Sequence, residues 1–253
     1  MKIFNKTQNN NTFYSPSESL NDLANKYETD KGTADKTTLS WGKEYPLHFC
    51  MNYTETYTRY MKPYRTVPIN FLEIGICDKR FPYASPKMWM SYFKNVDLYC
   101  VDNFWGCVDI NEKVDDIKNL NESGINFIYA DQGNFSDWNQ IKELNLNKFD
   151  YIVEDGSHWP NHMMVTLWQS CDLMKSGGYY FMEDIQNPLK SRGWYKYDNS
   201  LITDELFRTT ITKTLNSSFL NDVMNKKVND SYELVELVLS KSEIHYLAVF
   251  KRK

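Results

Sequence analysis

Five short apolar runs in the middle of the chain, each ending in an acid or a glycine, most constrain how it can fold. They are "NFLEIG", "LYCVDN", "NFIYADQ", "FDYIVED" and "YYFMED", at residues 70–75, 98–103, 126–132, 149–155 and 179–184. The segments between them are long enough for helices. Alternating strand and helix signals predict βαβ units and a parallel sheet, so we expect an α/β protein. The 253 residues suffice for one large α/β domain, or for a domain with a cap.

The segments on either side of these runs have different patterns. In residues 17–65, Tyr and Leu recur at three- and four-residue spacing, which predicts helices. Residues 1–15 are rich in Asn, Thr and Lys, and we expect a mobile or loosely docked tail. Near the C-terminus, "YELVELVLSKSEIHYLAVFKR" predicts an antiparallel hairpin that closes the sheet. We therefore expect an N-terminal tail and helical cap over residues 1–65, and an α/β domain over residues 66–253.

Composition excludes several classes of protein. The formal net charge is −4 and the basic residues are scattered, whereas binding to nucleic acid needs a basic patch or stripe. No apolar run approaches the roughly 20 residues of a membrane span, and the first residues lack the apolar core of a secretion signal. The five cysteines are an odd number without CxxC spacing, which is typical of reduced thiols. We expect a cytoplasmic protein, and the sequence leaves a homo-oligomer open.

Acids at the strand ends indicate where a ligand binds, because ligands of open parallel sheets bind beyond the carboxyl ends of the strands. A dinucleotide loop needs G-x-G-x-x-G, and after the first strand only Gly75 is present, so NAD and FAD are disfavoured. S-adenosylmethionine has no phosphate and tolerates fewer glycines. Asp102 is placed to bind its ribose hydroxyls, and Asp131 and Gln132 to read its adenine edge; Glu73 is a further candidate. Alternatively, these acids are ordinary turn or cap residues.

A second group of acids predicts a metal site. Asp155 ends the fourth strand, while Glu183 and Asp184 end the fifth, and adjacent strands lie about 5 Å apart. Carboxylates that close cannot all stay ionised without a cation, and their hard oxygens suit Mg²⁺, Mn²⁺ or Ca²⁺ better than zinc. His158 lies three residues past Asp155, where it could act as a general base. Alternatively, His158 caps the helix that starts near Pro160, and the acids are solvated.

Aromatic and cationic residues follow the last acidic pair. The segment "NPLKSRGWYKYDNS", residues 187–200, suits a sugar ring with a phosphate, although packing of the loop onto the domain explains its aromatic residues equally well. The residues concerned are Arg192, Trp194, Tyr195 and Tyr197. We expect the remaining histidines to be structural, although the first could line a pocket: His48, His162 and His245.

The motif "EDGSH", followed by "SGGYYFMEDIQ", resembles the metal-dependent bacterial sugar O-methyltransferases, which are related to the macrolide-sugar methyltransferases and the cephalosporin-hydroxylase-like family. "LANKYETDKGT", residues 23–33, resembles a segment that often precedes their methyltransferase domain. The resemblance covers roughly residues 20–190. It implies a Rossmann-like class I methyltransferase with a mostly parallel seven-stranded sheet. The glycine loop departs from the family pattern at Cys77 and Lys79, where small residues are commoner.

The resemblance also implies roles for individual residues. Asp155, Glu183 and Asp184 would hold Mg²⁺ or Mn²⁺ beside the methyl donor, with Asp155 counted among the catalytic residues and His158 as the base. Lys31, together with Asp30, would help to close the donor pocket.

The expected function is therefore S-adenosylmethionine-dependent, divalent-metal-assisted O-methylation of a sugar hydroxyl. The expected acceptor is a nucleotide-activated or capsular cell-surface sugar, with a heptose as the leading candidate. One alternative is an NAD-dependent nucleotide-sugar oxidoreductase, which would show the missing glycines and normally a Tyr-x-x-x-Lys pair. The other is a non-catalytic sugar-binding protein, which would not require a metal cage next to a histidine.

Overall fold

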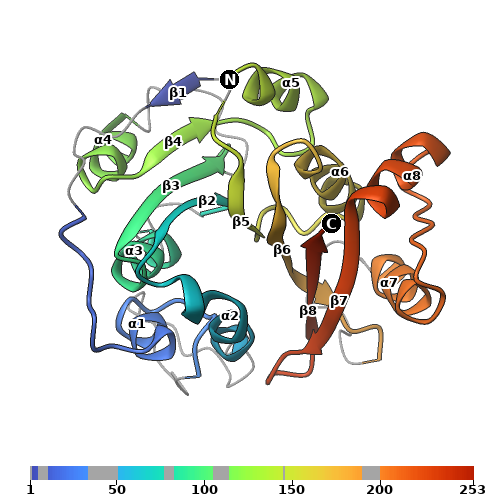
Figure 1. Cartoon of the computed structure of the whole chain (residues 1–253), viewed down its shortest axis with the longest axis horizontal. Helices are drawn as coiled ribbons and strands as arrows, with labels where there is room; N and C mark the ends of the chain where they lie inside the picture. Colours follow the sequence, from blue (N-terminus) through green and yellow to red (C-terminus); the bar gives the residue numbers. More distant parts are fainter. Residues whose placement is uncertain are drawn as a thin grey trace. The chain divides into compact units, whose positions relative to one another are not determined.

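The computed structural model describes residues 2–4, 11–33, 51–76, 83–104, 114–144, 146–189 and 200–253. By its internal contacts the chain divides into two compact units. Figure 1 shows the chain coloured along its sequence. The first unit holds Met1–Asp131 and Ser240–Ser242, and the second holds Gln132–Leu239 and Glu243–Lys253. The boundary expected at residues 65 and 66 stays a prediction. We describe each unit by itself.

Three parallel strands form the centre of the first unit, in the order β4, β3, β2: Asn126–Tyr129, Asn95–Asp102 and Pro68–Ile74. Their side chains are mostly buried, as expected for parallel strands covered on both faces. The helices of this unit are α1 (Leu20–Lys26), α2 (Tyr53–Met61), α3 (Ala84–Tyr92) and α4 (Val114–Glu122), with a 3₁₀ turn at Lys62–Tyr64. Helix α1 packs against α2 and α3, while α3 contacts β3 and α4 contacts β4.

An aromatic cluster joins the helices of the first unit to its strands. The ring of Trp89 on α3 lies 4.9 Å from that of Phe71 on β2, and 5.2 Å from that of Tyr57 on α2. All three side chains are buried, and aromatic pairs at such distances contribute roughly 0.5–1.5 kcal/mol beyond their burial. The helices predicted before the first strand are therefore part of the core of this unit.

For residues 2–4 and 11–15, the part of the N-terminal segment that the structure describes, the prediction of a mobile or loosely docked tail is wrong. Lys2–Phe4 forms strand β1, which pairs antiparallel with β4. The side-chain amide of Asn11 donates to the carbonyls of Met90 and Phe93, and Arg65 donates to the carbonyls of Ser15 and Glu18. An edge strand such as β4 offers unpaired backbone groups, and pairing with β1 satisfies them. The polar composition of this segment gave no sign of that pairing.

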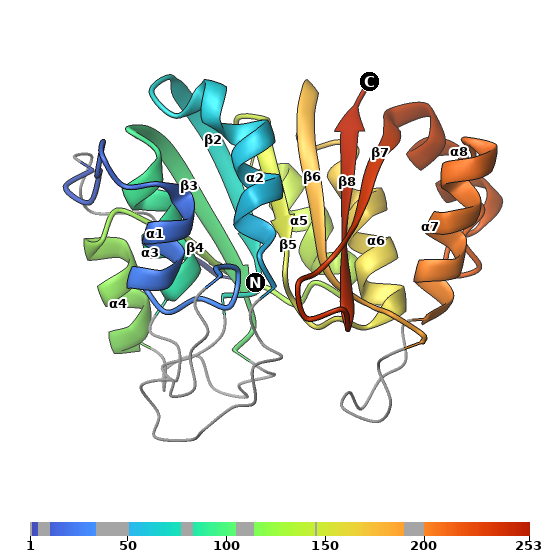
Figure 2. The ribbon, with the colours of Figure 1, turned by 90° about the horizontal axis from the view of Figure 1, so that it is seen from below.

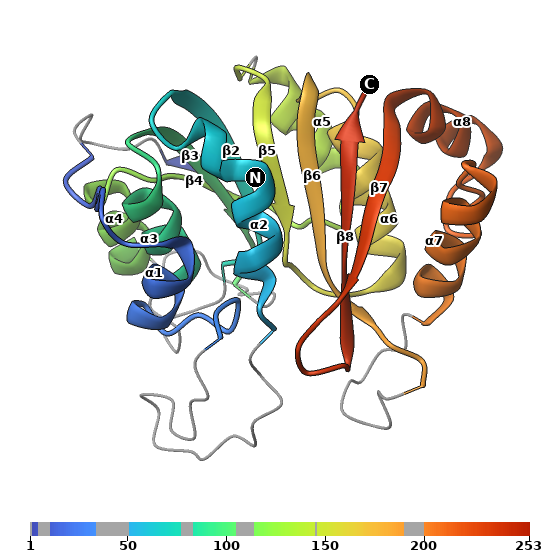
Figure 3. The ribbon, with the colours of Figure 1, turned by 60° about the horizontal axis from the view of Figure 1, so that its bottom comes forward.

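The second unit contains β5 (Phe149–Glu154), β6 (Met174–Gln186), β8 (His245–Arg252) and β7 (Tyr232–Leu239), in that order. Strand β6 is parallel to β5, and β8 is antiparallel to both β6 and β7. Figure 2 and Figure 3 show β8 between β6 and β7, with α7 and α8 beside β7. The predicted C-terminal hairpin and the predicted α/β class are both confirmed.

The helices of the second unit are α5 (Phe135–Glu143), α6 (Pro160–Ser170), α7 (Ser200–Thr212) and α8 (Asp222–Ser231). Helix α6 packs on β5, β6 and α8, while α7 contacts β6 and β7. Helix α6 begins with Pro160 at its first position, where a missing N–H costs no hydrogen bond, and it fixes the loop after β5. Among the described helices, none is long and apolar enough to cross a membrane.

Candidate functional site

In the first unit, the end of β2 and the end of β3 meet through Asp102. The main-chain N–H of Ile76 donates to Asp102 Oδ2 at 2.7 Å, and the N–H of Phe104 donates to Asp102 Oδ1. Gly75 has φ +84° and donates to the carbonyl of Val101, so the turn requires a residue that tolerates the left-handed region. The described part of the glycine turn is thus fastened to Asp102.

The other residues predicted to bind the donor in this unit lie at different depths. Glu73 on β2 is fully buried, and Lys31 is buried after α1, where its carbonyl accepts from Thr54 N–H. Burial, and then the negative charges of Glu73 and Asp102, raise the pKa of the Cys100 thiol well above its ordinary value. The two carboxyl groups therefore act on the same thiol, in the interior of the unit. Asp131, after β4, is half-buried, and Asp30 is exposed.

In the second unit, two of the three predicted metal ligands, Asp155 and Asp184, converge with the predicted base His158. His158 Nε2 lies 3.8 Å from Asp155 Oδ1 and 3.9 Å from Asp184 Oδ2. One potential ligand atom from each residue lies within 4.8 Å of the other two. The side chains of Asp155 and His158 are 22% and 26% exposed, so an ion and its further ligands can reach them.

The local backbone explains how Asp184 reaches this group. The register of β6 against β8 shifts between Met182 and Ile185. These two residues are three positions apart, whereas their partners on β8 are two positions apart. The extra residue is a bulge, which re-aims side chains at a strand end. Asp184 has φ +55° and His158 has φ +56°, both in the left-handed region. Such conformations cost roughly 1–3 kcal/mol and are concentrated at functional sites.

Glu183 and His245 depart from the prediction in different ways. Glu183 is buried, and it does not belong to the group of converging ligand atoms formed by Asp155, His158 and Asp184. The buried His245, which we expected to be structural, lies at the start of β8 opposite Gln186, and its Nδ1 is 3.7 Å from Asp184 Oδ1. Burial lowers the pKa of His245, although Asp184 opposes that shift, so its imidazole favours the neutral form. The antiparallel hairpin was the signal that could have placed it beside β6.

Buried polar groups lie under the loop that carries Asp155 and His158. The carboxyl group of Glu154 is fully buried, and burial raises its pKa to about 7 although His158 and Gln132 oppose the shift. Gln132 Nε2 donates to Glu154 Oε1 at 2.8 Å, so the amide expected to read adenine is engaged beneath the loop. His162 lies in the first turn of α6, as predicted, and its Nδ1 is 2.9 Å from Ser157 Oγ.

The donor set decides which ligand this group can hold. Two carboxylates and an imidazole within reach of one another offer hard oxygen atoms, which suit Mg²⁺ or Mn²⁺, and one nitrogen. Without a cation, two carboxylates at this spacing repel each other. The residues therefore fit a divalent cation, and the imidazole is close enough to exchange a proton with a group bound beside it.

Several predicted residues lie outside the described residues. They are His48, Cys77, Lys79 and the four residues of the aromatic segment, Arg192, Trp194, Tyr195 and Tyr197.

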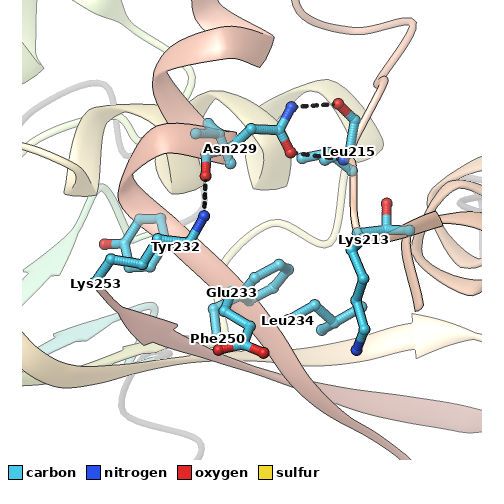
Figure 4. Close-up of a pocket in the computed structure, with 10 residues that line it drawn as sticks. Lys213, Leu215, Asn229, Tyr232, Glu233, Leu234, Phe250 and Lys253 are labelled. Atoms are coloured by element: carbon cyan, nitrogen blue, oxygen red, sulfur yellow. Dashed lines mark hydrogen bonds between the residues drawn. The ribbon is translucent and has the colours of Figure 1, made fainter. Parts of the chain in front are cut away.

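A pocket in the second unit lies away from this group (Figure 4). It is lined by residues of α7, α8, β7 and β8, including Phe250 and Lys253. His245 is at the other end of β8, five residues from Phe250, or roughly 17 Å along an extended strand. Inside the pocket, Asn229 Oδ1 accepts a hydrogen bond from the main-chain N–H of Leu215, and Asn229 Nδ2 donates one to the Leu215 carbonyl. The Asn229 amide is thus used in packing, and the converging acids remain the stronger candidate site.

In comparison with known proteins the chain is similar to O-methyltransferases, although no family model matches it. It is 28% identical over 171 residues to demethylmacrocin O-methyltransferase of Streptomyces fradiae, and 26% identical over 136 residues to mycinamicin VI 2''-O-methyltransferase of Micromonospora griseorubida. The alignments cover 66% and 53% of this chain, but 36% and 31% of the relatives. The chain thus spans about a third of the length of these relatives. They confirm the predicted resemblance to sugar O-methyltransferases.

A solved structure confirms the predicted class I methyltransferase fold. The MycE methyltransferase of mycinamycin biosynthesis, in complex with Mg, SAH and mycinamycin VI, superposes with a TM-score of 0.62 and 21% sequence identity. The match covers 94% of this chain and 55% of that one.

Proposed function

We propose that this chain transfers the methyl group of S-adenosylmethionine to a sugar hydroxyl, with the help of a divalent cation. The observation that carries the proposal is the convergence of Asp155, His158 and Asp184 from the loop after β5 and the bulge of β6. The similarity to sugar O-methyltransferases supports it, as does the likeness of the fold to a methyltransferase solved with Mg and SAH.

Asp155 and Asp184 would hold Mg²⁺ or Mn²⁺, and Glu183 is proposed as a third ligand on the strength of the sequence resemblance. Their carboxylates would bind the cation through oxygen, in the manner of hard ligands. The cation, when bound, would polarise and orient a sugar hydroxyl, which is otherwise a poor nucleophile.

His158 would act as the general base. Its Nε2 lies 3.8 and 3.9 Å from the carboxylates of Asp155 and Asp184, which supports a role beside the proposed cation. S-adenosylmethionine, when bound, would supply the methyl group from its sulfonium and would leave as a neutral thioether. The His158 imidazole would take the proton of the hydroxyl.

The first unit would bind the methyl donor. Asp102 would accept the ribose hydroxyls, while Gly75 and Glu73 would shape the loop against which the donor packs. Two backbone amides already hold the Asp102 carboxylate, which fixes its direction before any ligand arrives. Asp131 and Lys31 are proposed to complete this pocket.

The acceptor is proposed to be a nucleotide-activated or capsular cell-surface sugar, with a heptose as the leading candidate. The name of one relative supports a sugar acceptor, since it describes a 2'-O-methyltransferase of 8-demethyl-8-alpha-L-rhamnosyl tetracenomycin-C in Streptomyces olivaceus. The aromatic segment at residues 187–200 is proposed to contact the sugar ring.

Mass spectrometry with isotopically labelled S-adenosylmethionine tests the proposal. Purified protein with Mg²⁺ is incubated with a panel of nucleotide sugars, capsular oligosaccharides and glycosylated polyketides. We expect labelled methyl on one class of sugar and stoichiometric S-adenosylhomocysteine. Oxidation of a nucleotide sugar with NAD in place of methylation would favour the oxidoreductase instead. Binding of a sugar without turnover would favour the non-catalytic alternative.

A further inference from the structure

Gln132 begins the second unit, and its buried side chain bridges the end of β5 and the loop that follows it. Its Nε2 donates to Glu154 Oε1 at 2.8 Å, and its Oε1 accepts from the main-chain N–H of Ser157 at 2.7 Å. The indole N–H of Trp138 donates to the main-chain carbonyl of Gln132 at 2.8 Å. Both the side chain and the backbone of Gln132 are therefore fixed.

The loop packs on Gln132 without space for a side chain. A Cβ added to Gly156 would lie 1.7 Å from Gln132 Oε1, far closer than real Cβ atoms approach. The N–H of Gly156 lies 3.4 Å from Glu154 Oε1, the oxygen that also accepts from Gln132. We call these four residues, Gln132, Glu154, Gly156 and Ser157, the Gln132 clamp.

The clamp brackets the residues of the candidate site. Asp155 lies between Glu154 and Gly156, and His158 follows Ser157 directly. His158 has φ +56°, a conformation that persists only where the surroundings hold it. Asp184 is positioned separately by the bulge of β6. The distances from His158 to the two carboxylates thus depend on where the clamp holds the loop.

We propose that Gln132 is a positioning residue, which sets where Asp155 and His158 lie relative to Asp184 and acts on the cation and the proton only through them. The inference rests on the function proposed above. It replaces the expected contact between Gln132 and adenine, because one donor and one acceptor of the amide are already used in the clamp. Partners behind metal ligands generally contribute 10–100-fold to metal affinity or activity.

An exchange of the two side chains tests the hydrogen bond. Gln132→Glu brings two carboxylates together and should weaken binding of Mn²⁺, measured alone by electron paramagnetic resonance, by about 10–100-fold. In the double variant with Glu154→Gln, the amide at position 154 donates to the carboxylate at position 132, and one buried acid remains. The Mn²⁺ affinity should therefore recover. Gln140→Glu is the matched control. Gln140 lies on α5, where its amide donates to Ser136 Oγ, and its change should leave affinity unaltered.

A second measurement follows the His158 imidazole resonances by nuclear magnetic resonance in metal-free protein. They should shift in Gln132→Glu and return toward the wild-type positions in the double variant. The inference would be overturned if Gln132→Glu had the same His158 resonances and the same Mn²⁺ affinity as the wild type. It would also be overturned if Gln132→Glu lost Mn²⁺ affinity and the double variant did not regain it. Weakened S-adenosylhomocysteine binding with normal Mn²⁺ affinity would return Gln132 to the adenine role. If the wild type itself binds no Mn²⁺, the proposed function fails, and the His158 resonances still decide the role of Gln132.

Discussion

At the level of single residues, ionisation of the buried Glu154 should make the stability of the fold depend on pH. Its folded pKa of about 7 lies above its ordinary value of 4.5, so the folded state binds more protons than the unfolded state between these values. The stabilisation is complete below pH 4.5 and is lost as pH rises through 7, a change of about 3 kcal/mol at 1.36 kcal/mol per pKa unit. Glu154→Gln keeps an acceptor for Gln132 and removes the ionisation.

Urea unfolding of metal-free protein checks this expectation. Wild type and Glu154→Gln should differ little in pH dependence below pH 4.5, and the variant should become the more stable by about 3 kcal/mol at pH 8. If both proteins lose the same stability between pH 5 and pH 8, another group is responsible.

His158 is the residue whose loss should affect chemistry more than binding. His158→Ala should lower the single-turnover rate by about 10²–10⁴-fold, the usual contribution of a positioned base, while the fold and donor binding persist. The neighbouring His162→Ala removes an imidazole bound to Ser157 and should cost far less. A near-normal rate for His158→Ala, with a lowered melting temperature, would show that His158 is structural.

At the level of helices and strands, the sequence predicted where the strands lie, but it did not predict the irregularities within them. Apolar runs and terminal acids predicted β2 to β6 and the hairpin, because burial on both faces leaves a strong pattern. Side chains that alternate strictly between the two faces of a strand would not predict the bulge of β6. At this bulge Asp184 belongs to the converging group and Glu183 does not. A bulge depends on pairing with β8, which is far away in sequence.

The glycine turn after β2 offers a prediction at the same scale. Gly75→Ala places a Cβ at φ +84° and should lower stability by about 1–3 kcal/mol while also weakening S-adenosylhomocysteine binding. Gly177→Ala is the matched control, since Gly177 has φ +81° and open space around its Cβ. Calorimetry should therefore show reduced donor affinity only for Gly75→Ala. Equal donor affinities in the two variants would remove the turn from the donor site.

At the scale of the whole molecule, the proposed roles divide between the two units. Asp102 and the glycine turn lie in the first unit, and the converging acids lie in the second. The sequence predicted that Asp102 and the acids of the metal site follow different strands, but it placed them in one domain, residues 66–253, so the division into two units was not predicted. The tail was harder to predict, because pairing of β1 with β4 uses backbone groups that leave no side-chain pattern.

Titration of metal-free protein with Mn²⁺ tests the proposed binding of a divalent cation by Asp155 and Asp184 without knowledge of the acceptor. We expect one Mn²⁺ per chain in the wild type, competed by Mg²⁺, and a large loss of affinity in Asp155→Asn and in Asp184→Asn. Asp222→Asn, at the start of α8, changes an acid outside the converging group and should bind as the wild type does. Equal Mn²⁺ binding by the wild type and both site variants, or no Mn²⁺ binding by the wild type, would contradict the proposed metal site.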